Sequence, residues 1–212
     1  MSRSEKFMSN VVKNLPEVSP EMENYWNSHP SEFQEFLAGL AGQSWRVVEG
    51  VVHFTVTSDG TTGPDWIRRL ERSRHRLSDY AKDALLSPDF KSTNGVTTKI
   101  AVLPGKWFFK EEDRATASRI RDGARQRWKL VSPLADTACL IREKFSDRDL
   151  EAMGFAYIAV FHKPIRVYGC HVSGHPNLLA SSRQGYGHWL DAFCGKPDSR
   201  WDRHGAFAFA EK

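Results

Sequence analysis

Apolar residues recur with two different periods after residue 44, and the change of period predicts where strands and helices lie. Recurrence at every second position is typical of strands, whereas recurrence at every third or fourth position is typical of helices. We expect strands or hairpins over residues 45–57, 96–103, 155–161, 166–172, 177–181 and within the closing stretch 187–212. We expect helices over residues 64–72, 78–87, 111–128 and 134–144, and a short one after Ser146. This order predicts an α+β fold, with helices packed on one face of a largely antiparallel sheet.

Residues 1–43 differ from the remainder and are expected to form a helical, partly mobile extension to a single α+β domain over residues 44–212. One helix is predicted over Glu5–Leu15, where Pro16 ends it. A second is predicted from Ser31, because Ser31 and Gln34 have the spacing of a capping box. Pro16 and Pro20 interrupt the pattern between the two helices.

Composition narrows the class of protein more than it identifies a function. The 212 residues carry a formal net charge of +4, which is compatible with a polyanionic partner without requiring one. Three cysteines cannot form a disulfide framework, so we expect a reducing, cytoplasmic setting. No apolar run approaches the roughly 18 residues of a membrane span, and the first residues lack the apolar core of a secretion signal.

The closing stretch, GHWLDAFCGKPDSRWDRHGAFAFAEK, combines aromatic and charged residues. Phe207 and Phe209 alternate with alanines, which places both rings on one face of a last strand and in the core. The charged and imidazole side chains between residues 188 and 204 cannot all be buried without partners. We therefore expect an aromatic and polar surface suited to recognition of a protein or a small ligand.

Several sequence blocks carry a resemblance. VTSDGTTGPDWIRRLE, SPDFKSTNGVTT and LIREKFSDRDLEAMG resemble a group of uncharacterised bacterial proteins. A turn is predicted over residues 196–199. The tail, with Gly187-x-Trp189, Pro197-Asp198-x-Arg200 and Ala206-Phe207, is similar to the closing motif of C-type-lectin-like domains, including the variable proteins of diversity-generating retroelements. Ala206 departs from the glycine usual in that motif. The resemblance implies a C-type-lectin-like C-terminal block that displays a ligand-binding set: Gln184, Tyr186, His188, Asp191, Phe193, Ser199, Trp201, Asp202 and His204.

Two arginine-rich segments support an alternative, a nucleic-acid-associated protein. Arg121 and Arg125 follow Arg114 by 7 and 11 positions on the predicted helix 111–128, which places each within about 20° of Arg114 around the helix axis. Such a strip can bind phosphates, although a solvated helix face explains it as well. The predicted helices over 64–87, with Arg68, Arg69 and Arg72, fit a packed helical hairpin better than a helix-turn-helix.

Catalytic and metal-binding motifs are absent from the sequence. There is no G-x-S-x-G, P-loop, H-E-x-x-H or G-x-G-x-x-G pattern. Cys170, His171 and His175 resemble half of a zinc site without the other half, so neither a metal nor another cofactor is expected. Five of the eight histidines lie in the last third of the chain, which leaves a His-dependent hydrolase or nuclease as a third hypothesis. The pattern favours a binding protein over an enzyme.

Overall fold

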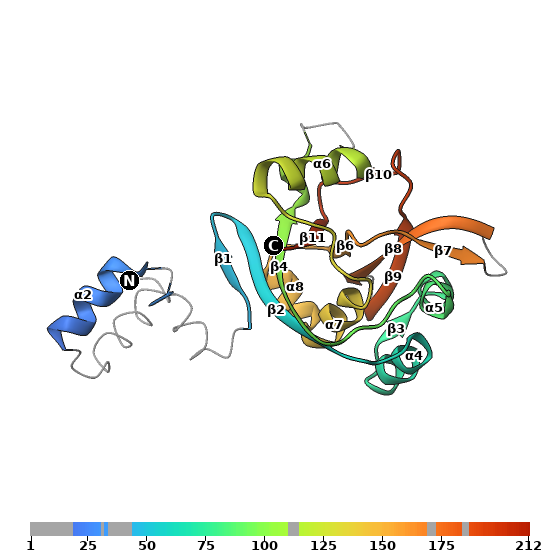
Figure 1. Ribbon diagram of the computed structural model, residues 1–212, viewed down its shortest axis with the longest axis horizontal. Helices are drawn as coiled ribbons and strands as arrows, with labels where there is room; N and C mark the ends of the chain where they lie inside the picture. The colour runs from blue at the N-terminus through green and yellow to red at the C-terminus, as the bar shows by residue number, and fades with distance from the viewer. Residues whose placement is uncertain (1–18, 31, 34–43, 110–114, 169–172, 184–186) are drawn as a thin grey trace. The chain divides into compact units, whose positions relative to one another are not determined.

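The computed structural model describes residues 19–30, 32–33, 44–109, 115–168, 173–183 and 187–212, and divides into two compact units, 1–46 and 47–212 (Figure 1). The described helices are α2 (Pro20–Ser28), α4 (Gly63–Arg72), α5 (Asp79–Leu86), α6 (Ala117–Trp128), α7 (Thr137–Lys144), α8 (Asp147–Ala152) and the 3-10 turn η1 (Gly105–Trp107). The described strands are β1 (Arg46–Val48), β2 (Val51–Asp59), β3 (Arg76–Leu77), β4 (Asn94–Pro104), β5 (Ala115–Thr116), β6 (Tyr157–Val160), β7 (Ile165–Tyr168), β8 (Ser173–Arg183), β9 (His188–Cys194), β10 (Arg200–Trp201) and β11 (Ala206–Ala210).

The first unit contains α2, which corrects one expectation. Pro20, predicted to interrupt the helical pattern, is the first residue of this helix. Proline suits that position because its fixed φ matches the helix and its missing N–H has no intrahelical partner there. Ser19 caps the helix through its hydroxyl, which accepts a hydrogen bond from the Met22 N–H at 3.3 Å. The predicted helix over Glu5–Leu15 and the start at Ser31 lie outside the described residues.

A nine-stranded sheet organises the second unit and confirms the α+β class. Its order is β1-β2-β4-β11-β6-β8-β9-β3, and β7 also pairs with β8. The pairs β11–β6 and β3–β9 are parallel, whereas the pairs β2–β4, β4–β11, β6–β8, β7–β8 and β8–β9 are antiparallel. The parallel pairing brings β11, the last strand, between β4 and β6 at the centre of the sheet. The C-terminal block is therefore part of the main sheet.

Helices cover both faces of this sheet. α4, α5, α7 and α8 lie on one face, and α6 lies on the other (Figure 1). The expectation of helices on one face therefore holds for four of these five helices. Ile120 and Ala124 of α6 pack in one buried cluster with Phe161, Phe207 and Phe209, because alternation sends these rings toward α6.

Local signals set most element boundaries as predicted. Gly50 lies in the β1–β2 turn with φ of 79°, which suits glycine. Ser78 caps α5 by accepting from the Ala81 N–H at 3.2 Å, and Ser146 and Asp149 form the capping box of α8. The helix predicted over 111–128 begins later, at Ala117, because residues 115–116 pair with β10 instead. No helix in the described part of the chain is both long and apolar enough to cross a membrane.

His162 joins β6 to β7 and belongs to the fold. These two strands pair with successive halves of β8 and leave a gap between them. The His162 Nε2 atom accepts a hydrogen bond from the Leu179 N–H at 3.0 Å, and Nδ1 donates to the Lys163 carbonyl at 2.7 Å. Burial lowers the pKa of His162 to about 4, so the ring is neutral near pH 7. The His162 imidazole thus accepts the hydrogen bond that a neighbouring strand would otherwise accept from the Leu179 N–H.

Candidate ligand-binding site

A pocket of about 340 Å³ opens on the α6 face of the sheet, between β9 and the turn that leads to β11. We call it the aromatic pocket; its lining residues are Tyr157, Phe193, Cys194, Ser199, Arg200, Trp201 and Asp202. The ring centroids of Tyr157 and Phe193 are 5.5 Å apart, and those of Phe193 and Trp201 are 5.7 Å apart. Three rings therefore form one continuous aromatic wall.

Backbone pairing places this wall. Trp201 pairs with Ala115 across the short β10–β5 ladder, and the Ser199 N–H donates to the Lys196 carbonyl at 3.0 Å in the predicted turn. Gly205 passes directly over Tyr157: a Cβ added at Gly205 would lie 2.0 Å from the Tyr157 ring. Only glycine allows that approach, so the segment 199–205 is held against β6.

Two polar groups of the pocket have distinctive chemistry. The Trp201 indole N–H is buried and has no hydrogen-bond acceptor among the described residues. A buried donor without an acceptor is costly, and a bound acceptor relieves that cost. Burial, and then the nearby Asp202 carboxylate, raises the pKa of the Tyr157 phenol well above its ordinary value. Tyr157 therefore keeps its proton at alkaline pH values where an ordinary tyrosine loses it.

The structure brings together four of the nine residues predicted to bind a ligand. Phe193, Ser199, Trp201 and Asp202 all line the aromatic pocket. Trp201 corrects one expectation, because its side chain is 5% exposed and packs in the core, where it contacts the rings of Phe161 and Phe207. The pairing of β10 with β5 turns this indole inward.

The other predicted residues lie elsewhere. His188 and Asp191 are an odd number of positions apart on β9, so they face opposite sides of the sheet. His188 lies on the side of α7 and α8, and Asp191 lies on the side of Phe193 but outside the lining of the pocket. Gln184 and Tyr186 fall outside the described residues.

His204 lines a second and larger pocket, of about 620 Å³. We call it the basic pocket. Its lining residues are Val47, Gly50, Val52, Pro104, Gly105, Lys106, Glu151, Met153, Gly154, Phe155, Ala156, Arg183, Arg203, His204 and Gly205. The pocket lies where strands end or begin: β4 ends at Pro104, β8 ends at Arg183 and β2 begins at Val51, while η1, the segment from Glu151 to Ala156 and the turn before β11 supply most of the lining. Three basic side chains and one imidazole therefore meet at one end of the sheet.

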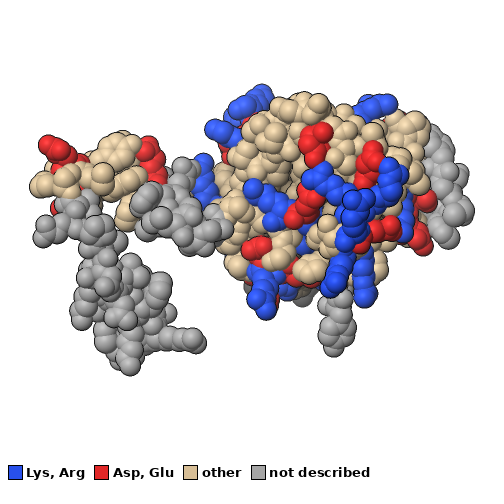
Figure 2. Space-filling view, turned by 90° about the horizontal axis from the view of Figure 1, so that it is seen from below, with Lys and Arg blue, Asp and Glu red and all other residues tan. Residues whose placement is uncertain are grey.

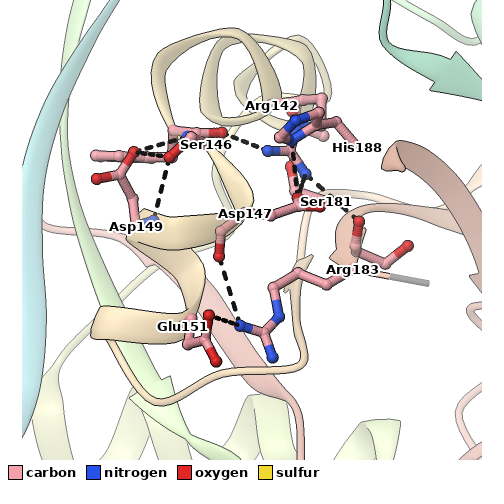
Figure 3. A network of polar contacts seen from close by, with 11 residues as sticks. Arg142, Ser146, Asp147, Asp149, Glu151, Ser181, Arg183 and His188 are labelled. Carbon is pink, nitrogen blue, oxygen red and sulfur yellow. Dashed lines mark hydrogen bonds and ion pairs between the residues drawn. The ribbon is translucent and has the colours of Figure 1, made fainter. Parts of the chain in front are cut away.

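A polar network anchors α8 beside this pocket (Figure 3). The fully buried Arg142 guanidinium donates to Asp147 Oδ1 at 3.2 Å and to the Phe145 carbonyl. The same Asp147 oxygen lies 3.0 Å from His188 Nδ1. Arg183 lies 3.5 Å from the Asp147 carbonyl and 3.4 Å from Glu151 Oε2. The network thus ties the start of α8 to the end of β8 and the start of β9.

The arginines of the nucleic-acid alternative do not form a free strip in the described residues. Arg121 donates to the carbonyls of Phe161 and His162 at 2.7 and 2.8 Å and to the Ser132 hydroxyl at 3.1 Å. Arg125 is exposed, and Arg114 lies outside the described residues. Arg121 therefore binds backbone carbonyls of the β6–β7 connection in its own protein.

The arginines of α4 are interleaved with acidic side chains. Arg68 pairs with Asp65, and Arg69 holds both Glu143 oxygens at 2.6 Å as well as Asp59. Hydrogen bonds from Thr61 and Arg69 lower the pKa of Asp59 to about 2. Figure 2, which views the molecule from the side of α4, shows basic and acidic side chains mixed over that face. These contacts fit a solvated, ion-paired surface, and α4 packs against α5 as the predicted helical hairpin.

The described residues offer no group of three or more His, Cys, Asp or Glu side chains that could hold a metal ion. Cys170 and His171, part of the predicted half site, lie outside them, and His175 is exposed on β8. Sequence analysis did not identify four of the pocket residues, because no local motif marks them and they come together only in the folded chain: Tyr157, Lys106, Arg183 and Arg203.

Comparisons with protein-family models, curated proteins and solved structures give no significant match for this chain.

Proposed function

We propose that this protein is a binding protein whose aromatic pocket accepts a planar group that carries a hydrogen-bond acceptor. Two facts support this most strongly: Trp201 lines the pocket together with Tyr157 and Phe193, and its indole N–H has no acceptor among the described residues. Flat rings stack favourably on aromatic walls, and one well-placed acceptor fixes their orientation.

The size and rim of the pocket agree with a small ligand. About 340 Å³ lies at the lower end of the range of small-molecule sites. Ser199, Arg200 and Asp202 surround the rings with a hydroxyl, a guanidinium and a carboxylate, which can select among the substituents of a ring. We also propose a reducing, cytoplasmic setting, which agrees with the free, exposed thiol of Cys194.

Two probes of matched shape test the proposal. Quinoline carries one ring-nitrogen acceptor, and naphthalene carries none. In saturation-transfer NMR, quinoline should give the stronger signal, and Phe193→Ala should weaken it several-fold because the central ring of the wall is lost. Tyr80→Ala is the matched control, since it removes an exposed ring from α5 on the opposite face of the sheet. Equal quinoline signals from wild type and Phe193→Ala would refute the proposal.

A further inference from the structure

We infer that the basic pocket is a second binding site, for the phosphate group of a phosphorylated small molecule. The inference is independent of the aromatic pocket, because the described residues that line the two pockets do not overlap. Lys106 belongs to η1, Arg183 to the end of β8 and Arg203 to the turn before β11, and Glu151 is the one carboxylate among the described lining residues. His204 adds a ring N–H donor. Cationic groups that converge on a concavity are suited to an anion.

Arg183 is positioned for such a ligand without being locked. Its guanidinium lies 3.4 Å from Glu151, whose side chain is 73% exposed. An exposed ion pair of this kind is worth little, so a phosphate can compete for the guanidinium. The other contact of Arg183 is with the backbone carbonyl of Asp147, and Arg142 binds the carboxylate of that aspartate (Figure 3). Phosphate oxygens match the planar fork of arginine in a bidentate contact.

The walls of the pocket leave room for more than a phosphate ion. Four glycines belong to the lining; Gly105 and Gly205 pack closely against other residues, whereas Gly154 does not. A Cβ at Gly154, where φ is 82°, would meet no heavy atom within 4 Å, so this wall is open to a ligand. The volume of about 620 Å³ lies within the usual range for small-molecule sites. A concave site favours a small phosphorylated molecule over the backbone of a nucleic acid.

Calorimetric titration with ribose 5-phosphate, with ribose as the uncharged counterpart, tests the inference. Ribose 5-phosphate should bind and ribose should not. Lys106→Ala and Arg183→Ala should each weaken binding about tenfold, the loss expected for one charge-assisted hydrogen bond. Glu151→Gln should tighten binding, because it removes a repulsive carboxylate and releases Arg183. Lys196→Ala is the control, since Lys196 is exposed and outside the pocket.

Three results would overturn the inference. These are no binding of ribose 5-phosphate, unchanged affinity in both Lys106→Ala and Glu151→Gln, or tighter binding of a DNA duplex than of ribose 5-phosphate. A gain of affinity in Glu151→Gln cannot arise from a damaged fold, so this variant separates binding from stability. Quinoline binding should stay unchanged in all four variants, which keeps a failure of this site distinguishable from a failure of the aromatic pocket.

Discussion

The aromatic pocket and the basic pocket are lined by successive parts of one segment, residues 199–202 and residues 203–205, yet they are built from different kinds of side chain. Trp201, in the aromatic pocket, is 5% exposed and contacts Phe161, Phe193 and Phe207. Lys106 and Glu151, in the basic pocket, extend from the surface. The aromatic pocket therefore includes a ring that is also part of the hydrophobic core. In the basic pocket, substitution of Lys106 or Glu151 should leave the core undisturbed. Binding and stability should be coupled in the first pocket and separable in the second.

The largest expected effect is on the core behind the aromatic pocket. Phe207→Ala should lower the free energy of unfolding by about 3–5 kcal/mol, because Phe207 is fully buried among other rings. Urea denaturation measures this loss. Phe207→Leu, which keeps most of the volume, should cost less. A loss below about 1 kcal/mol for Phe207→Ala would show that the ring cluster does not hold the core.

His162 should make stability depend on pH. Its pKa is about 4 in the folded protein, against an ordinary value near 6.5, so the unfolded chain takes up a proton first as pH falls. Stability from this group is intact above pH 6.5 and should fall by about 3 kcal/mol in all as pH approaches 4. Urea denaturation at pH 7 and at pH 4.5 measures most of this change.

Two variants separate His162 from the other histidines. His162→Gln should flatten the dependence between pH 6.5 and 4.5, whereas His204→Gln, at an exposed position, should preserve it. A wild-type protein with equal stability at pH 7 and pH 4.5 would contradict the assignment of a neutral, buried imidazole.

A smaller effect is expected at the wall of the aromatic pocket. Trp201→Phe should lower the free energy of unfolding by about 1–2 kcal/mol. The loss of part of a buried ring destabilises the fold, and the removal of a buried donor without an acceptor partly offsets this loss. The variant should bind quinoline and naphthalene with similar affinity, since only the wild type offers the N–H. Titration of both probes measures this. A preference for quinoline that survives in Trp201→Phe would assign the acceptor contact to another residue.

The smallest effect is expected in the basic pocket. Lys106→Ala should change the free energy of unfolding by no more than about 0.5 kcal/mol, because the side chain is exposed. Lys196→Ala should behave alike in thermal unfolding. A loss above about 2 kcal/mol in Lys106→Ala would remove the contrast between the two pockets.

Features fixed by neighbouring residues could be predicted from the sequence. Ser78 and Ser146 marked two helix starts because a cap depends on residues three positions away. Phe207 and Phe209 were correctly placed in the core, because strand alternation is also local. The same rule, applied to β9, would have separated His188 from Asp191 and divided the predicted surface.

Features that depend on distant segments could not be predicted. The pairing of β10 with β5 buries Trp201 and delays the start of α6 to Ala117, although the charged residues before it favour a helix. The parallel pairing of β11 with β6 brings Gly205 over Tyr157. No motif in either segment indicates its partner. The resemblance to C-type-lectin-like proteins stays a prediction.

The most direct test of the binding proposal is the Trp201 indole N–H resonance in a ¹H–¹⁵N spectrum. The chain has 7 tryptophans, and Trp201→Phe identifies the signal by its loss. Quinoline should shift this resonance strongly, as expected when the N–H gains an acceptor, and naphthalene should shift it little. A Trp201 resonance that stays in place while quinoline is bound would contradict the proposal.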